Sequence, residues 1–88
     1  MELKNKIIVI TGAGSGIGRA LAVRFHAEGA KAVVSVDINL ENAQETAAMV
    51  GGVAMSADVA KEEDILRVIE TTETDIGPID LFCSNAGV

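Results

Sequence analysis

Short apolar runs alternate along the chain with longer stretches in which apolar residues recur every three or four positions. The apolar runs, which we expect to be strands, are 6–11, 31–37, 53–56 and 79–84. The first two are β-branched and do not alternate with polar residues, which is typical of parallel strands buried on both faces. The intervening stretches fit amphipathic helices over about 17–29, 39–50 and 61–75. In the first helix, the predicted buried stripe is Ile17, Leu21 and Phe25.

The order of these elements predicts one α/β fold. Strands that alternate with helices over short connections form a parallel sheet with right-handed crossovers and helices on both faces. We therefore expect a Rossmann-like, three-layer αβα arrangement with strand order 3-2-1-4. The fourth strand would lie at an edge, although Ile79, Leu81 and Phe82 are as apolar as an interior strand. We expect residues 1–88 to be the N-terminal part of a single domain of this fold that stops before a fifth strand.

The composition favours a folded domain with an aliphatic core. The chain is 49% apolar and 23% charged, with two Phe and no Trp or Tyr. We expect Met49 and Met55 to fill gaps in that core. The net charge of −6 argues against nucleic acid or an anionic membrane as a partner. With one cysteine, no signal-peptide pattern and no long uncharged stretch, the chain is expected to be cytoplasmic.

A glycine-rich turn, Thr-Gly-Ala-Gly-Ser-Gly-Ile-Gly, joins the first strand to the first helix. The start of a helix presents free N–H groups and partial positive charge, so such a turn can bind phosphate without a basic side chain. Gly12 would allow the sharp turn, Gly16 the close approach of a pyrophosphate, and Gly18 tight packing of the helix. Ser15 can add a hydroxyl, and Arg19 replaces the lysine that a Walker loop requires. The alternative is a glycine-rich turn without a ligand.

Asp37 ends the second strand, 19 residues after Gly18. At this position a carboxylate can accept hydrogen bonds from both hydroxyls of the adenosine ribose, which favours NAD. A 2'-phosphate about 4 Å away would be repelled by roughly 4 kcal/mol per unit charge at an effective dielectric constant near 20. The next residues, Ile38, Asn39 and Leu40, carry no positive charge to reverse this preference. The alternative role for Asp37 is to cap the second helix.

Four motifs lie at the carboxyl ends of successive predicted strands, where open α/β sheets bind ligands. They are the glycine turn, Asp37, Asp58-Val59 and Asn85-Ala86-Gly87. Together they resemble the short-chain dehydrogenase/reductase family over the entire chain. The resemblance implies that Asp58 accepts a hydrogen bond from the adenine amino group and that Val59 covers the ring.

The resemblance further implies that Asn85, Ala86 and Gly87 line the ribose end of the pocket or stabilise the central sheet. Ser84 stands where family members often carry a second Asn. For Asp58, the alternative role is to cap the third helix. The complete set of expected cofactor-binding residues is Gly12, Ser15, Gly16, Ile17, Gly18, Asp37, Ile38, Asp58, Val59, Asn85, Ala86 and Gly87.

The resemblance places catalysis outside these residues. Family members use a Ser and a Tyr-x-x-x-Lys pair downstream, whereas this chain contains no Tyr. The parent protein is expected to be a homo-oligomeric oxidoreductase that uses NAD(H) and an alcohol or carbonyl substrate, while the chain alone is expected to lack activity. We assign no catalytic residue and no metal ligand. His26 has no Cys and no second His nearby, and Cys83 is expected to be a small buried side chain without an activating base.

Two other functions remain open at this point. An S-adenosylmethionine-dependent methyltransferase also uses a glycine turn, which Gly12, Gly14 and Gly16 would satisfy. Against it, Ile10 and Thr11 precede the turn where an acidic residue is usual, and the Asn-Ala-Gly segment has no role there. The third hypothesis is a noncatalytic nucleotide-binding module.

Overall fold

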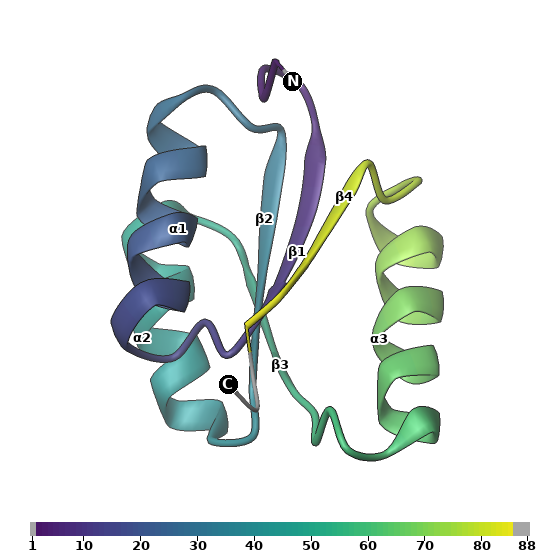
Figure 1. Ribbon diagram of the computed structural model, residues 1–88. Helices are drawn as coiled ribbons and strands as arrows, with labels where there is room; N and C mark the ends of the chain where they lie inside the picture. Colours follow the sequence, from purple (N-terminus) through teal and green to yellow (C-terminus); the bar gives the residue numbers. More distant parts are fainter. Residues whose placement is uncertain (1, 86–88) are drawn as a thin grey trace.

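Four parallel strands form one sheet with helices on both faces in the computed structural model, which describes residues 2–85 (Figure 1). The elements are β1 (Ile7–Thr11), α1 (Gly16–Ala27), β2 (Ala32–Asp37), α2 (Leu40–Val50), β3 (Val53–Ser56), α3 (Glu62–Asp75) and β4 (Leu81–Ser84). The strand order is β3-β2-β1-β4, and every pair is parallel. The predicted α/β fold class and strand order are therefore confirmed.

The sheet separates two apolar clusters because successive side chains of a strand point to opposite faces. Helices α1 and α2 cover one face of the sheet, here called the α1/α2 face, and α3 covers the other, the α3 face (Figure 1). The buried cluster of the α1/α2 face comprises Ile8, Ile10, Ala13, Ala22, Val33 and Val50. The buried cluster of the α3 face comprises Val9, Val34, Val36, Ala57 and Val68. All of β1 is buried, which agrees with its unbroken apolar sequence.

Two predictions about the core are wrong. Ile17 is 75% exposed, because it lies in the first turn of α1, beyond the end of β1; Gly18 and Ala22 are the buried residues of that helix. Met49 is 54% exposed, since Ala47 and Val50 occupy the face of α2 that contacts the sheet. Between residues 2 and 85, none of the helices combines the length and apolar character needed to span a bilayer.

Candidate functional site

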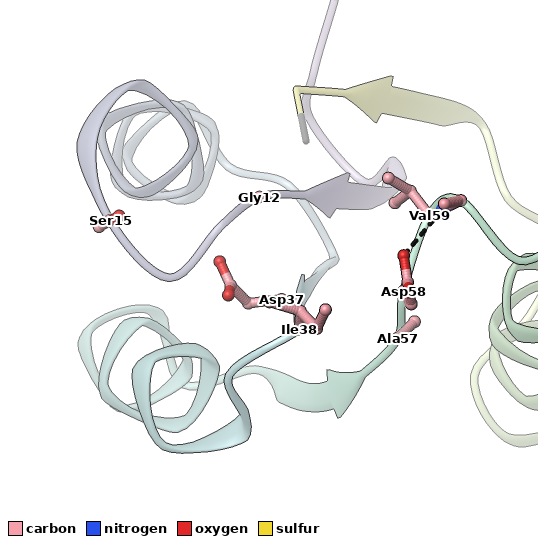
Figure 2. A pocket seen from close by; sticks show the side chains of 8 residues that line it. Gly12, Ser15, Asp37, Ile38, Ala57, Asp58 and Val59 are labelled. Atoms are coloured by element: carbon pink, nitrogen blue, oxygen red, sulfur yellow. Dashed lines mark hydrogen bonds between the residues drawn. The ribbon is translucent and has the colours of Figure 1, made fainter. Parts of the chain in front are cut away.

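Two neighbouring cavities open at the carboxyl edge of the sheet. The larger, here called the Asp37 cavity, has a volume of about 390 Å³ and is lined by Gly12, Ser15, Asp37, Ile38, Ala57, Asp58, Val59 and Ala60 (Figure 2). The smaller, the Asn85 cavity, has a volume of about 220 Å³ and is lined by Gly12, Ser15, Ile17, Gly18 and Asn85. They share Gly12 and Ser15, so the glycine turn lies between them.

The fold thus brings together residues that are far apart in the sequence. Every predicted site residue within 2–85 lines one of the two cavities, except Gly16, which lies between the lining residues Ser15 and Ile17. Ala57 and Ala60 also line the Asp37 cavity and were not predicted. The predictions for Ala86 and Gly87 lie outside the described residues.

The glycine turn leaves the start of α1 open. Gly12 and Gly16 have φ angles of 66° and 58°, which residues with a Cβ rarely adopt. A Cβ on Gly16 would have no neighbour within 4 Å, whereas one on Gly18 would overlap the carbonyl of Gly12. Ser15 is the N-cap residue of α1, but its side chain makes no capping hydrogen bond. Ser15 therefore leaves the first-turn amides of α1 without a side-chain cap, as an anion site requires.

The carboxylate of Asp37 is held by two main-chain N–H groups. Its Oδ2 accepts a hydrogen bond from Gly14 N at 2.9 Å, and its Oδ1 accepts one from Asn39 N at 3.0 Å. The cap of α2 is Asn39, whose side chain accepts a hydrogen bond from Asn42 N, so the alternative role of Asp37 as the helix cap is wrong. Figure 2 shows the carboxylate pointing from the end of β2 toward the glycine turn. A carboxylate has about four acceptor positions, so this one retains capacity for a ligand.

Gly14 is a site residue that the sequence did not single out for this role. A Cβ on Gly14 would lie 2.6 Å from Oδ2 of Asp37 and 2.6 Å from Cβ of Asn42. The turn can approach both groups only because residue 14 has no side chain. A glycine in the middle of the turn was the available signal, but its neighbours come from β2 and α2 and are defined only by the fold.

Asp58 forms a local turn and does not cap α3. Its Oδ1 accepts a hydrogen bond from Ala60 N at 2.9 Å, while its own N–H donates to Oδ2 of Asp64 at 2.8 Å. The N-cap residue of α3 is Lys61, which makes no side-chain capping bond. The alternative role as a helix cap is therefore wrong. The predicted contact between Asp58 and adenine stays a prediction.

Asn85 connects the end of β4 to the end of β1. Its N–H donates a hydrogen bond to Oγ1 of Thr11 at 3.1 Å, and that hydroxyl donates to the carbonyl of Cys83 at 3.4 Å. Asn85 Nδ2 is buried and has no hydrogen-bond partner within residues 2–85. A buried amide N–H without a hydrogen-bond partner destabilises the fold. A ligand oxygen in the Asn85 cavity could accept a hydrogen bond from this group.

Cys83 is half-buried and packs against the α1/α2 cluster. Burial raises the pKa of the Cys83 thiol above its ordinary value, which keeps the side chain protonated and weakly reactive. Among residues 2–85, no group of three His, Cys, Asp or Glu side chains is placed to hold a metal ion.

Comparisons with known proteins agree with this geometry. The family model described as short chain dehydrogenase matches residues 6–88. The chain is 40% identical over 89 residues to "Tropinone reductase-like 1" of Erythroxylum coca, an alignment that covers 99% of this chain and 32% of the relative.

Two solved structures are also similar. A hydroxysteroid dehydrogenase from Escherichia coli has a TM-score of 0.86 and 33% identity, over 99% of this chain and 39% of that chain. A protein named ribose-5-phosphate isomerase from Brucella melitensis has a TM-score of 0.91 and 34% identity, over 99% of this chain and 34% of that chain. The chain thus spans about a third of the length of the proteins it matches.

Proposed function

Because the chain belongs to the short-chain dehydrogenase family, we propose that it forms the N-terminal, NAD-binding portion of an oxidoreductase. The parent protein would transfer a hydride between NAD(H) and an alcohol or carbonyl group of a small substrate. The observation that carries this proposal is the uncapped start of α1 between two cavities, with the carboxylate of Asp37 in the larger one.

The pyrophosphate of NAD fits the glycine turn. Its two negative charges would accept hydrogen bonds from the first-turn amides of α1 and gain from the positive end of the helix dipole. The open space beside Gly16 would let the phosphate oxygens reach the main chain, and Ser15 would add a hydroxyl donor. Since no basic side chain among residues 2–85 lines either cavity, main-chain groups would provide the attraction.

The adenosine would occupy the Asp37 cavity. Asp37 would accept hydrogen bonds from the ribose hydroxyls on acceptor positions that Gly14 and Asn39 leave free. The exposed side chain of Ile38 and the side chain of Val59 would cover the adenine, and Asp58 would accept from its amino group. Repulsion between the Asp37 carboxylate and a 2'-phosphate supports NAD over NADP.

The nicotinamide side of the cofactor would extend into the Asn85 cavity. Ile17 and Gly18 would contact it there, and the unpartnered Nδ2 of Asn85 would donate to an oxygen of the cofactor. Ala86 and Gly87 would continue this wall. When bound, the nicotinamide supplies the hydride acceptor or donor, while the residues of this chain bind and orient the cofactor. We assign none of them to proton transfer, so the chain alone would be catalytically incomplete.

Two further parts of the proposal concern the parent protein. It would work in the cytoplasm as a homo-oligomer, and neither nucleic acid nor a membrane would be its partner. The acidic charge of the chain supports the second point. The methyltransferase alternative is not favoured, because the family model and the relative from Erythroxylum coca belong to the dehydrogenases and reductases.

Isothermal titration calorimetry with NAD, NADP and S-adenosylmethionine tests the proposal. We expect NAD to bind at least about tenfold more tightly than NADP, which corresponds to about 1.4 kcal/mol. Asp37→Asn should reduce this ratio toward one. The control is Asp75→Asn, which removes the same charge from an exposed position on α3 and should leave the ratio unchanged. Tighter binding of S-adenosylmethionine than of NAD, or equal binding of NAD and NADP by the unmodified protein, would contradict the proposal.

A further inference from the structure

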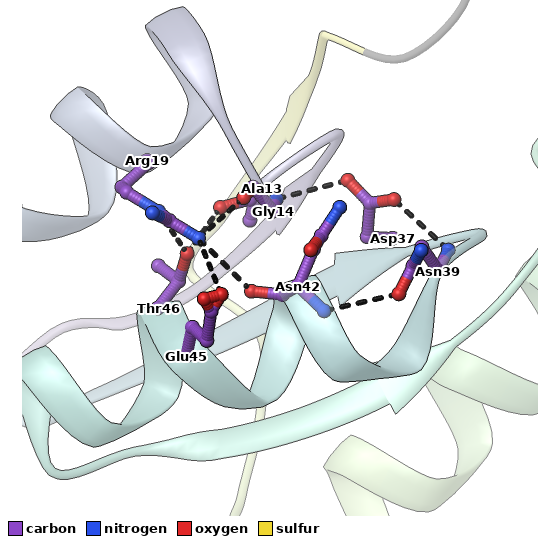
Figure 3. A network of polar contacts seen from close by, with 8 residues as sticks. All are labelled: Ala13, Gly14, Arg19, Asp37, Asn39, Asn42, Glu45 and Thr46. Carbon is purple, nitrogen blue, oxygen red and sulfur yellow. Dashed lines mark hydrogen bonds and ion pairs between the residues drawn. The ribbon is translucent and has the colours of Figure 1, made fainter.

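A part-buried polar network lies at the glycine turn, with Arg19 and Thr46 on one side of Ala13 and Gly14, and Asp37 on the other side (Figure 3). Arg19 extends from α1 toward α2, where its Nε donates a hydrogen bond to Oγ1 of Thr46 at 2.9 Å. Thr46 is completely buried, and its hydroxyl lies 2.7 Å from the carbonyl oxygen of Ala13. Nη2 of Arg19 donates to the carbonyl of Gly14 at 2.6 Å. The network thus connects both helices to the main chain of the turn.

The chemistry of the groups fixes the direction of each hydrogen bond. A guanidinium can only donate, so Oγ1 of Thr46 must act as the acceptor toward Arg19. The hydroxyl hydrogen of Thr46 is then available for one further partner. The carbonyl of Ala13 can only accept, so Thr46 donates to it. The carbonyl of Ala13 thus sets the direction of the Thr46 hydroxyl hydrogen, while Arg19 holds the oxygen of that hydroxyl in place.

That hydrogen bond to Ala13 determines the orientation of one peptide group. The Ala13–Gly14 peptide is planar and trans, so its carbonyl and its N–H point in opposite directions. Its carbonyl is held by Thr46 on one side, and its N–H therefore points to the other side. On that side lies Oδ2 of Asp37, which accepts the bond from Gly14 N at 2.9 Å.

Without this network, the peptide could rotate. Gly14 has no Cβ and tolerates either orientation of the main chain. A rotated peptide would direct its carbonyl oxygen at the Asp37 carboxylate, and the two negative oxygens would repel each other. Asp37 would then keep only its bond from Asn39, which holds Oδ1 at 3.0 Å. One bond leaves the carboxylate free to turn, whereas two bonds on different oxygens fix its plane.

We propose that Arg19 and Thr46 are positioning residues that orient the Asp37 carboxylate toward the ribose diol of the cofactor and thereby set the preference for a ribose with a free 2'-hydroxyl. This inference rests on the proposed NAD-binding function. Neither residue lines a cavity, so they act on the cofactor only through Gly14 and Asp37.

The test compares the binding of NAD with that of an NAD analogue lacking the adenosine 2'-hydroxyl. The dissociation constant of the analogue divided by that of NAD measures how strongly Asp37 binds that hydroxyl. The Asp37→Asn variant gives this ratio in the absence of the carboxylate. Thr46→Val removes the hydroxyl of Thr46 at nearly constant volume. We expect it to lower the ratio by about tenfold, the effect of one hydrogen bond to a charged group. Thr46→Ser, which keeps the hydroxyl, should restore most of the ratio.

The matched control is Thr72→Val. Thr72 is also a completely buried helical threonine, but it lies on α3, and its hydroxyl has no hydrogen-bond partner among the residues that the structure describes. It should therefore leave the ratio unchanged. A purely structural role of Thr46 would weaken binding of both ligands equally. That outcome would overturn the inference while leaving the role of Asp37 intact.

Two further variants, Arg19→Lys and Asp37→Asn, complete the test. If Thr46→Val does not fold, Arg19→Lys tests the same step, because a single ammonium lacks the planar fork that reaches both Thr46 and Gly14. A ratio that stays at the unmodified value in Arg19→Lys would overturn the inference. A ratio that does not change in Asp37→Asn would instead contradict the proposed role of Asp37 itself.

Discussion

The two faces of the sheet each bury one helical threonine, and the two residues have different surroundings. On the α1/α2 face, Thr46 accepts from Arg19 and donates to the main chain of the glycine turn. On the α3 face, Thr72 is equally buried, but within residues 2–85 its hydroxyl has no hydrogen-bond partner. Burial of a polar residue therefore does not by itself indicate a role in the site. The partners of the hydroxyl distinguish the two cases.

The difference follows from what each layer covers. α1 and α2 flank the glycine turn, whose main-chain groups need partners when they are buried. α3 instead contacts the end of β3, where Nη2 of Arg67 donates to the carbonyl of Ser56 at 2.7 Å and Asp64 accepts from Asp58 N. These contacts join α3 to the segment around the end of β3, and neither of them involves the glycine turn. The α1/α2 face thus supports the glycine turn, where we propose the anion site, whereas the α3 face mainly buries apolar surface.

The largest effect should come from separating α1 from the turn. In Gly18→Ala, the new methyl group would overlap the carbonyl of Gly12, which is main chain and cannot move aside easily. We expect a loss of about 3 kcal/mol in the free energy of unfolding, with loss of NAD binding. Chemical denaturation followed by circular dichroism measures the free energy of unfolding. A stability equal to that of the unmodified protein would contradict the close contact between α1 and the turn.

The direct comparison of the faces is Thr46→Val against Thr72→Val. The first leaves the carbonyl of Ala13 and Nε of Arg19 without their partner, and we expect a loss of about 2 kcal/mol in stability. The second removes a hydroxyl that satisfies no partner in the described chain, so the change should be near zero or stabilising. Urea unfolding of both variants measures the difference. An equal loss of unfolding free energy in the two variants would mean that the two buried hydroxyls contribute equally to stability.

A second pair of variants compares the two ends of the α1/α2 face. Gly16 and Gly51 have φ angles of 58° and 65°, and a Cβ on either would have no neighbour within 4 Å. Alanine at each position should therefore cost about 1 kcal/mol in stability, from backbone strain alone. Only Gly16→Ala should also weaken NAD binding in calorimetry, because its methyl group would occupy the space proposed for the pyrophosphate. Equal NAD affinity in both variants would argue against a phosphate at this turn.

The smallest effect concerns Cys83 on the edge strand β4. Burial raises the pKa of its thiol, so the fraction of reactive thiolate at pH 8 is lower in the folded chain than in the unfolded one. We expect iodoacetamide to alkylate Cys83 more slowly without urea than with it. The thiol should also lose its contribution to stability as the pH rises past the folded pKa, since the unfolded chain ionises first. Equal alkylation rates would show that β4 does not shield the thiol.

The sequence predicted the local features of this protein well. The unbroken apolar run of β1 and the position of the glycine turn depend on neighbouring residues, so a periodic pattern is enough to identify them. The spacing between Asp37 and the glycine turn was also enough to select Asp37 as a candidate acceptor for the ribose hydroxyls. Its possible role as a helix cap was not eliminated by the sequence, because Asn39, two residues later, is an equally good capping residue.

Periodicity failed where the geometry of an element end matters. Ile17 continues the apolar spacing of Leu21 and Phe25, yet it lies beyond the end of the sheet and has no core to contact. Met49 is exposed for a related reason: Val50, one residue further along α2, already occupies the position that contacts the sheet. An apolar residue type shows that burial is possible, but the packing of neighbouring elements decides whether it occurs.

The sequence by itself determined the order of the elements, the strand arrangement and the glycine turn, because these follow from local patterning and from the general rules of parallel sheets. Only the tertiary structure decided the partners of the polar groups. Arg19 and Thr46 are 27 residues apart, and Gly14 and Asp37 are 23 apart. A hydrogen bond requires two groups within about 3 Å in a defined direction. Such precision across distant segments arises only when the helices have packed on the sheet.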